Sequence, residues 1–369
     1  MSRRAYAEID LKALQHNFCL AKSLLPQSKT VAVIKADAYG HGISQCAWAL
    51  QDETDCFGVA HISEAMQLRA AGISKPVLLM EGVFSAEEME LAARKGFWIT
   101  VSNIEQMKLV SANKLDKPLK IWLKINTGMN RLGVSIAQVK DLFNTLKAMS
   151  SVSDVVLMTH FACADDPGST MTETQLTRFK AAVSGLDAEL SLANSAAVIA
   201  WSSQLRFSQV QWIRPGIMLY GSSPLLAEAD QVAAGAESKP LQAVMTLHAK
   251  LIEVRTLQAG EFLGYGATWS ADKNTRIGVV SIGYGDGYPR HVKQGTPVLV
   301  GGKRVPLVGR VSMDMITVDL SSQAQAKIGD PVILWGRGLP VDEIAQWADT
   351  ISYELLCQVT ARVPRDYLK

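Results

Sequence analysis

The 369-residue sequence lacks the features that mark several classes of protein. No uninterrupted apolar stretch is long enough to span a bilayer. Residues 1–10 contain two arginines with no apolar core after them, which argues against a secretory signal. Lys and Arg form no dense block and the formal net charge is only +2. The composition therefore does not favour nucleic acid or an anionic membrane as a partner.

Cysteine is scarce and scattered. The five cysteines are Cys19, Cys46, Cys56, Cys163 and Cys357. They are odd in number, form no CxxC motif and have no obvious base beside them in the sequence. We therefore expect reduced thiols that serve packing, in a cytoplasmic protein.

Two motifs of other enzyme classes are also missing. Gly40-His41-Gly42 lacks the third glycine of a dinucleotide-binding GxGxxG motif, so we reject a Rossmann fold. The six histidines are dispersed and no HxH occurs. A metal-dependent barrel hydrolase would need further histidines near the first strand, but it stays open as the rival enzyme class. Its candidate residues are Lys124 (as a metal-bridging carbamate), His160, Asp165 and Asp166.

Eight short apolar runs alternate with amphipathic segments between about residues 30 and 220. The runs are residues 31–35, 57–60, 77–80, 98–101, 119–125, 155–161, 190–193 and 211–214. A helix over residues 11–25 precedes them. Strict alternation predicts a parallel sheet, and eight units predict closure into a (β/α)8 barrel.

The pattern changes after about residue 235. Strand patterns at residues 241–254, 277–282, 297–300, 305–308, 315–318 and 332–334 are separated by Gly, Pro, Asp and Lys. Helical patterns return only at residues 341–348 and 353–358. We predict an α/β protein with an N-terminal (β/α)8 TIM-like barrel, residues 1–235, followed by a mostly antiparallel β domain, residues 236–369. Residues 227–239 would join the two.

Polar residues follow the predicted barrel strands at the point where each strand ends. They are Lys35, the segment 126–131, Thr159-His160, Asn194-Ser195 and Arg214-Pro215-Gly216. Functional residues of such barrels gather at the carboxyl ends of the strands. We therefore expect these five sets to meet on one face.

The chemistry of these residues points to one cofactor. Lys35 closes a buried apolar run, where desolvation disfavours its charged form, and a neutral amine is what imine chemistry needs. The Ser195 hydroxyl and the Gly216 backbone N–H could hold a phosphate, although Asn194-Ser195 alone would be read as a helix cap. A lysine, a phosphate cradle and the cation Arg214 together suggest pyridoxal phosphate.

Five motifs then resemble alanine racemase, in order and over nearly the whole chain. They are VIKADAYGHG (33–42), NTGMNRLG (126–133), RPGIMLYG (214–221), GYGAT (264–268) and GRVSMD (309–314). The resemblance implies an isomerase that interconverts L-alanine and D-alanine, a peptidoglycan precursor, by a two-base mechanism on a pyridoxal phosphate aldimine. It also implies a homodimer whose active site is shared between subunits.

The resemblance implies a role for each matching residue. Lys35 would form the aldimine and act as the base on one face of the substrate, and Tyr265 from the second subunit would be the base on the other. Arg214 would face the pyridine nitrogen. Tyr284 also lies in a Gly-Tyr-Gly segment, so the choice of Tyr265 rests on the resemblance.

The remaining implied roles concern binding. The other cofactor contacts would be Tyr39, His160, Asn194, Ser195, Gly216, Ile217 and Tyr353. Arg131 and the backbone of Met313 would hold the substrate carboxylate, and Lys124 is a candidate for carbamylation. Asp165, Tyr284, Arg290, Arg310 and Ile351 would line the substrate channel, unless they form ordinary surface ion pairs.

Two further readings use the same cofactor. A non-catalytic pyridoxal phosphate carrier would need only the barrel, and the β domain with Tyr265 and Met313 argues against it. An amino-acid decarboxylase of similar barrel is disfavoured by Arg214, because a decarboxylase needs a protonated pyridine, normally held by an acid.

Overall fold

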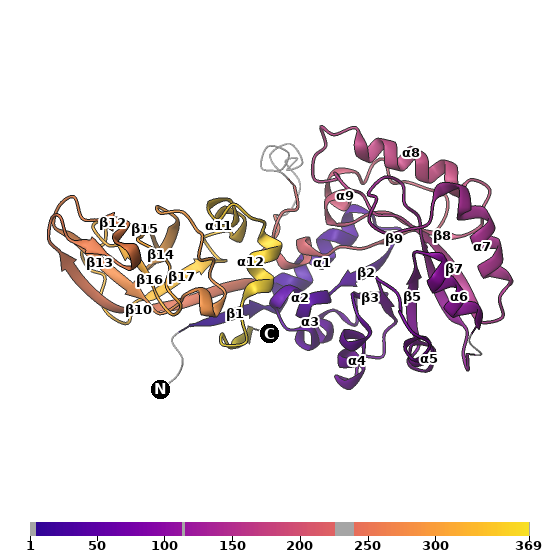
Figure 1. Cartoon of the computed structure of the whole chain (residues 1–369), viewed down its shortest axis with the longest axis horizontal. Helices are drawn as coiled ribbons and strands as arrows, with labels where there is room; N and C mark the ends of the chain where they lie inside the picture. Colours follow the sequence, from indigo (N-terminus) through magenta and orange to yellow (C-terminus); the bar gives the residue numbers. More distant parts are fainter. Residues whose placement is uncertain (1–4, 113–114, 226–239, 369) are drawn as a thin grey trace.

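The computed structural model describes residues 5–112, 115–225 and 240–368. Figure 1 shows a barrel and a β domain side by side, with β1 and α12 between them. The predicted boundary between residues 235 and 236, and the joining residues 227–239, lie outside the described residues.

The predicted barrel of eight parallel strands is confirmed. The strands are β2 (Lys29–Val33), β3 (Cys56–Val59), β4 (Val77–Leu79), β5 (Phe97–Val101), β6 (Leu119–Lys124), β7 (Val152–Met158), β8 (Glu189–Ser191) and β9 (Trp212–Ile213). They are hydrogen-bonded in the order β8-β7-β6-β5-β4-β3-β2-β9. A parallel bridge between Leu190 and Gln211 joins β8 to the start of β9 and closes the ring. The first strand ends at Val33, two residues before the predicted end.

Helices surround the barrel. They are α1 (Leu11–Leu24), α2 (Lys35–Gly40), α3 (Ile43–Leu50), α4 (Ile62–Ala70), α5 (Ala86–Lys95), α6 (Ile104–Ala112), α7 (Val139–Ala148), α8 (Met171–Val183) and α9 (Ser195–Ala200). Side-chain caps fix several starts: the Asp10 carboxylate accepts from the Ala13 N–H at α1, and Ser85 accepts from the Glu88 N–H at α5. No helix in the described ranges is long and apolar enough to cross a membrane.

The interior of the barrel is a packed core rather than a channel. Every second residue of a strand points inward. The inward residues Val31, Cys56, Leu78, Trp122, Val156, Met158 and Trp212 form one buried cluster. Trp98 packs edge-on against Trp212 with ring centres 5.5 Å apart. This filling leaves the carboxyl ends of the strands as the face open to chemistry.

The C-terminal part is mostly antiparallel, as predicted. Its strands are β10 (Met245–Leu257), β11 (Phe262–Leu263), β12 (Trp269–Ser270), β13 (Thr275–Val280), β14 (Pro297–Val300), β15 (Lys303–Val308), β16 (Ile316–Asp319) and β17 (Pro331–Trp335), with helices α11 (Val341–Trp347) and α12 (Ser352–Gln358). The pattern analysis missed the two-residue strands β11 and β12, because two residues show no alternation. These strands flank the turn η3 (Tyr265–Ala267).

The two ends of the described chain meet in the β domain. Strand β1 (Tyr6–Asp10) pairs antiparallel with β10 and parallel with β18 (Arg365–Leu368). Neither strand was predicted from the sequence. The chain therefore begins in the sheet of the β domain, enters the barrel at α1, and returns to the same sheet at its end.

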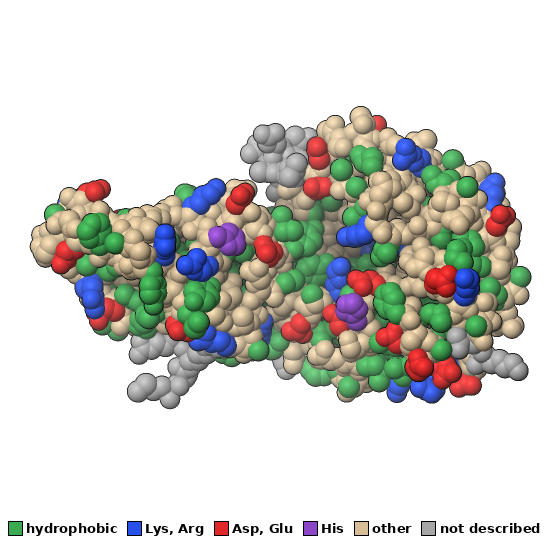
Figure 2. Space-filling view, in the orientation of Figure 1, with side chains coloured by type: hydrophobic (Ala, Val, Ile, Leu, Met, Phe, Trp, Pro, Cys, Tyr) green, Lys and Arg blue, Asp and Glu red, His purple; other side chains and the backbone are tan. Residues whose placement is uncertain are grey.

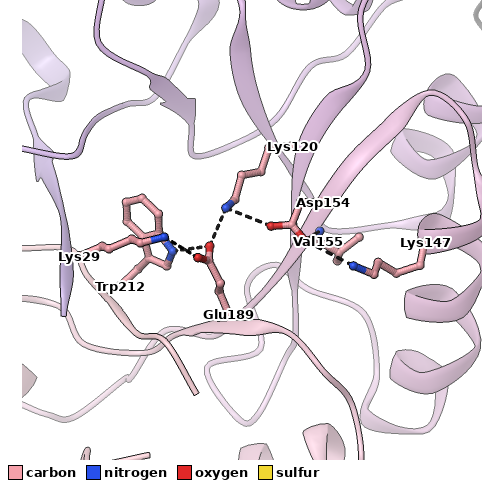
Figure 3. A network of polar contacts seen from close by, with 7 residues as sticks. All are labelled: Lys29, Lys120, Lys147, Asp154, Val155, Glu189 and Trp212. Carbon is pink, nitrogen blue, oxygen red and sulfur yellow. Dashed lines mark hydrogen bonds and ion pairs between the residues drawn. The ribbon is translucent and has the colours of Figure 1, made fainter. Parts of the chain in front are cut away.

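A polar network closes the barrel at the amino ends of its strands (Figure 3). The Glu189 carboxylate accepts hydrogen bonds from Lys29 at 2.6 Å, Lys120 at 2.5 Å and the Trp212 indole at 2.8 Å. Burial raises the pKa of Glu189, but these hydrogen bonds outweigh burial and hold the pKa at about 2. The carboxylate is therefore charged at neutral pH.

We expect Glu189→Gln to lower the free energy of unfolding by about 2 kcal/mol, because Lys29 and Lys120 lose the charge they share. The folded-state pKa of about 2 lies below the ordinary glutamate value, so the stabilisation is complete above about pH 4.5 and is lost as pH falls towards 2. Urea unfolding followed by circular dichroism at several pH values measures the difference.

The matched control is Lys147→Ala. Lys147 contacts Asp154 at 3.4 Å in the same network, but both side chains are substantially exposed. Its loss should cost less than about 1 kcal/mol. The stabilising role of Glu189 would be contradicted if both substitutions lowered the free energy of unfolding equally. It would also be contradicted if the loss in Glu189→Gln did not change with pH.

Candidate active site

The predicted site residues fall into two groups. One group lies at the carboxyl ends of the barrel strands: Lys35, Tyr39, Lys124, Arg131, His160, Asp165, Asn194, Ser195, Arg214, Gly216 and Ile217. The other lies in the C-terminal part: Tyr265, Tyr284, Arg290, Arg310, Met313, Ile351 and Tyr353. In Figure 2, hydrophobic side chains line the recess between the two parts, and Lys or Arg side chains lie on its barrel side.

The segment after Lys35 has an unusual backbone. Residues Ala36 to Tyr39 all have φ between 52° and 54° and ψ between 42° and 52°, which is a left-handed helical turn. Such a conformation costs about 1–2 kcal/mol for each L-residue. Nothing in the sequence of this segment signals it, because only Gly40 and Gly42 favour positive φ. The turn carries Tyr39 into the buried part of the barrel mouth.

Neighbouring side chains satisfy the polar groups of this turn. The buried His41 ring lies with Nδ1 at 3.0 Å from the Ala38 carbonyl and 2.9 Å from the Tyr39 carbonyl, so Nδ1 donates. Burial lowers the pKa of His41 to about 4, which keeps the ring neutral. At the other end, the Ala36 N–H donates to Glu64 of α4 at 2.7 Å. His41 and Glu64 thus hold the turn from both ends.

Arg214 is almost completely buried, with 2% of its surface exposed. One terminal nitrogen donates to Ser191 Oγ at 2.5 Å, and the other donates to the carbonyls of Thr159 and Leu192 at 2.8 and 3.1 Å. Its Nε–H is buried and has no hydrogen-bond partner among the residues that the structure describes. An unpaired buried donor is costly, so Nε marks a place where a bound group would supply an acceptor.

His160 lies beside this guanidinium. Its Nδ1 is 3.4 Å from a terminal nitrogen of Arg214. Burial, with the positive charges of Arg214 and Lys124, lowers the pKa of His160 to about 3. The pKa of Arg214 is itself lowered by burial to about 10, which leaves it charged at neutral pH. The pair is therefore a neutral imidazole that accepts from a charged guanidinium.

Hydroxyl and backbone groups meet at the ends of β8 and β9. Asn194 caps α9, its side chain accepting from the Ala197 N–H at 3.0 Å. The buried Ser195 hydroxyl instead accepts from the Gly216 N–H at 2.8 Å. A Cβ placed on Gly216 would lie 2.7 Å from the Tyr39 hydroxyl, so only glycine lets the phenol approach. The next residue, Ile217, is buried. We call these polar groups, gathered at the ends of β8 and β9, the anion cradle.

Aromatic rings support Tyr39 from two sides. Its ring centre is 4.8 Å from that of Tyr220 and 6.0 Å from that of Tyr353 in α12. Tyr220 was not predicted as a site residue, although the motif that contains it was. It is buried and donates to the Val33 carbonyl at 3.0 Å, which joins the cradle to the end of β2. Burial and then the charge of Asp165 raise the pKa of Tyr353 to about 12, so this loop carboxylate lies near α12.

Lys124 ends β6 with only 7% of its surface exposed. Burial, followed by the charges of Arg214, Arg131 and Lys35, lowers the pKa of Lys124 to about 8. The barrel mouth therefore gathers four cationic side chains, which suits anionic ligands. Within the described residues, no group of three or more His, Cys, Asp or Glu side chains is placed to hold a metal ion.

Residues of the second group other than Tyr353 are exposed. Tyr265 has 72% of its surface exposed, Met313 53% and Tyr284 39%. The N–H of Tyr284 donates to the Ser312 carbonyl, so the Tyr284 and Met313 loops lie side by side. A Cβ placed on Gly266 would lie 3.0 Å from an Arg310 nitrogen, so Arg310 lies beside the Tyr265 turn.

A single chain does not unite the two groups. Strand β12, which follows the Tyr265 turn directly, lies at the end of the β domain away from the barrel (Figure 1). Tyr353 lies against the barrel through its contact with Tyr39. Ile351, two residues earlier, and Arg290 are both exposed. The fold thus joins Tyr353 to the barrel residues and leaves Tyr265 apart from them.

Comparisons with known proteins all identify the same family, alanine racemase. The family model described as alanine racemase, N-terminal domain, matches residues 9–224, and that described as alanine racemase, C-terminal domain, matches residues 244–367. The catabolic alanine racemase of Pseudomonas putida is 48% identical over 366 residues, covering 99% of each chain.

Solved structures agree. The biosynthetic alanine racemase of Pseudomonas aeruginosa superposes with a TM-score of 0.92 at 46% identity, covering 100% of both chains. The alanine racemase of Bartonella henselae, a crystal structure with covalently bound pyridoxal phosphate, gives 0.87 at 28% identity over 100% of both chains.

The lowered pKa of His160 predicts that its ring stays neutral in the ligand-free protein down to well below pH 5. We expect the ring carbon resonances of His160, identified by their loss in His160→Gln, to keep the shifts of a neutral imidazole from pH 8 to pH 5. Nuclear magnetic resonance of selectively labelled protein measures them. A titration with its midpoint above pH 5 would show that burial and the neighbouring positive charges do not control the pKa of this ring.

Proposed function

The chain belongs to the alanine racemase family, and we propose that it racemises alanine with Lys35 on one face of the substrate and the partner subunit's Tyr265 on the other. One observation carries the proposal. Lys35 follows β2 at the mouth of the barrel, whereas Tyr265 is exposed on the turn that precedes β12, a strand at the end of the β domain away from the barrel (Figure 1). An exposed tyrosine remote from its own barrel fits a site that a second chain completes.

The residues at the barrel mouth fit pyridoxal phosphate, which the Bartonella henselae relative holds covalently. The buried Nε–H of Arg214 offers a donor to the pyridine nitrogen. The Ser195 hydroxyl, the Tyr39 hydroxyl and the Gly216 backbone offer polar groups to the phosphate, with Asn194, Ile217 and Tyr353 around them. When bound, the cofactor supplies an aldehyde for the Lys35 amine and an electron-withdrawing ring that makes the Cα proton of alanine removable.

The two bases divide the proton transfer. Removing a proton from one face and returning it to the same face regenerates the same enantiomer. A second group on the opposite face is needed to deliver a proton there. Lys35 and the partner subunit's Tyr265 would exchange these roles according to the direction of the reaction. A phenol loses its proton more readily beside positive charge, which Lys124, Arg131 and Arg214 supply at the mouth.

Substrate selection would come from both chains. The exposed guanidinium of Arg131 can bind the alanine carboxylate in a bidentate manner, and the backbone of Met313 would complete that site. Tyr353 and the partner subunit's Tyr265 would narrow the pocket to the size of a methyl side chain. The channel residues are Asp165, Tyr284, Arg290, Arg310 and Ile351.

Lys124 meets the requirements for carbamylation. Its pKa of about 8 leaves part of the amine neutral at neutral pH, and the side chain is buried. The amine would add to carbon dioxide and release one proton, giving a carbamate. That anion would offset the neighbouring cations and orient the Arg131 guanidinium towards the substrate.

The surface of the β domain supports a homodimer. Phe262, Tyr265, Met313 and Met315 are large apolar or aromatic side chains with 43–72% of their surfaces exposed. Such exposure is typical of an interaction surface. A two-fold arrangement would bring each Tyr265 turn to the barrel mouth of the other chain.

We also assign the enzyme to the cytoplasm. None of the five cysteines is disulfide-bonded. Unpaired thiols suit a reducing compartment.

Lys35→Ala should abolish covalent attachment of pyridoxal phosphate and lower the rate of D-alanine formation from L-alanine by at least about 10³-fold, since the amine is both the attachment point and a base. Borohydride reduction followed by whole-protein mass measures attachment, and chiral chromatography measures D-alanine. Lys29 lies at the opposite end of the barrel, so Lys29→Ala should keep both the covalent attachment and the formation of D-alanine. Retention of the mass increase in Lys35→Ala would refute the role.

A second experiment tests the shared site. Lys35→Ala and Tyr265→Ala should each be inactive alone. When mixed under subunit exchange, a heterodimer would contain one intact site, formed by Lys35 of one chain and Tyr265 of the other. Random mixing should restore about a quarter of wild-type activity. If both residues act within one chain, mixing would restore none.

A further inference from the structure

The left-handed turn that follows Lys35 is bound by a residue from the other end of the chain. Arg365, half-buried at the start of β18, donates to the Gly40 carbonyl through both Nε and Nη2, each at 3.2 Å. The same guanidinium donates to the carbonyls of Thr360, Val363 and Val359, each at 2.7 Å. Gly40 is the last residue of α2 and directly follows the left-handed residues.

These contacts use the whole guanidinium. Arginine has five N–H donors in a rigid plane, and all five are directed at these four carbonyls. Three of the carbonyls belong to the segment between α12 and β18, and the fourth belongs to α2. Arg365 therefore ties the C-terminal segment of the β domain to the turn at the barrel mouth.

Packing around the turn leaves it little room to move. A Cβ on Gly40 would lie 2.2 Å from the Leu356 carbonyl of α12, and one on Gly42 would lie 2.0 Å from the Tyr367 hydroxyl. Arg365 and Tyr367 are two residues apart on β18, so their side chains point to the same side of the strand. Both glycines thus allow close approach of the turn to α12 and β18.

The turn links directly to residues of the proposed site. Lys35 precedes the first left-handed residue, Ala36, and Tyr39 is the fourth and last of them. A strained backbone persists only where its surroundings over-determine it. Loss of the two bonds to Gly40 would let the turn relax towards right-handed or extended conformations, which would move both the amine and the phenol.

We propose that Arg365 is a positioning residue, which locks the left-handed turn and so fixes Lys35 and Tyr39 relative to the anion cradle. The proposal rests on the proposed function for the roles of these two residues. The residue does not touch the substrate; it acts through the backbone of α2.

The test compares Arg365→Ala and Arg365→Lys with Arg276→Ala. Arg276, in β13, also caps carbonyls, donating to Gln323 and Ala324 at 2.7 Å and to Ala326, but it lies in the β domain sheet rather than at the turn. It therefore reports the cost of losing such a cap without any effect on α2.

The first measurement is hydrogen–deuterium exchange of the cofactor-free protein. Arg365→Ala should raise the exchange rate of residues 36–42 at least about tenfold, while residues 119–124 of the barrel keep their wild-type rates. Arg365→Lys, with three donors in place of five, should give an intermediate rate. Arg276→Ala should leave residues 36–42 unchanged.

The second measurement is function. Arg365→Ala should weaken binding of pyridoxal phosphate to the cofactor-free protein about tenfold and lower kcat about 10- to 100-fold, because small misplacements of reacting groups are costly. The KM for alanine should change less than about twofold, since Arg131 and Met313 are untouched. Wild-type exchange at residues 36–42, or an unchanged kcat, in Arg365→Ala would overturn the proposal.

The remaining outcomes are also decisive. If Arg365→Ala does not fold, Arg365→Lys takes its place, and wild-type exchange with wild-type kcat in that variant would overturn the proposal. If Arg276→Ala loosens residues 36–42 equally, the effect is general instability and the proposal is wrong. If the wild-type protein neither binds pyridoxal phosphate nor racemises alanine, the proposed function fails, whereas the exchange data still decide whether Arg365 locks the turn.

Discussion

The buried charge of Arg214 is the constraint on which the barrel mouth depends. Arg214 is 2% exposed, and the ends of β7 and β8 supply acceptors for its two terminal nitrogens through Thr159, Ser191 and Leu192, which leaves the Nε–H, unpartnered among the described residues, open to a ligand. Burial first, and then this charge, lower the pKa values of His160 and Lys124. Closure of the barrel brings these strand ends together, and it thereby sets the charges of the site before any ligand binds.

The spacing of apolar residues and the chemistry of the polar residues predicted much of this arrangement. The alternation of apolar runs with amphipathic segments predicted the eight barrel strands and the change to antiparallel strands. The carboxyl ends of barrel strands lie on one face, which predicted that Lys35, His160, Ser195 and Arg214 lie at one mouth. The short strands β1 and β18 were not predicted, because they pair with segments more than 200 residues away or with each other.

The left-handed turn shows a different limit of sequence reasoning. Of the four left-handed residues only Asp37 belongs to a type that tolerates positive φ, and a run of four is imposed by contacts with Glu64, His41 and β18. Arg365 could not be singled out for the same reason, since a lone arginine near the end of a sequence has no distinguishing pattern. Tertiary contacts decide these features, and only the folded chain reveals them.

The position of β1 bears on how the protein forms during its synthesis. This strand is made before the barrel strands, yet its neighbours β10 and β18 follow about 240 and 360 residues later. The barrel strands β2 to β9 pair only among themselves and can assemble while the rest is still being made. Strand β1 can pair with β10 once residues 245–257 have been made, but β18 and the Arg365 contacts with the barrel form only after residues 365–368 have followed, so the turn after Lys35 gains its last contacts late.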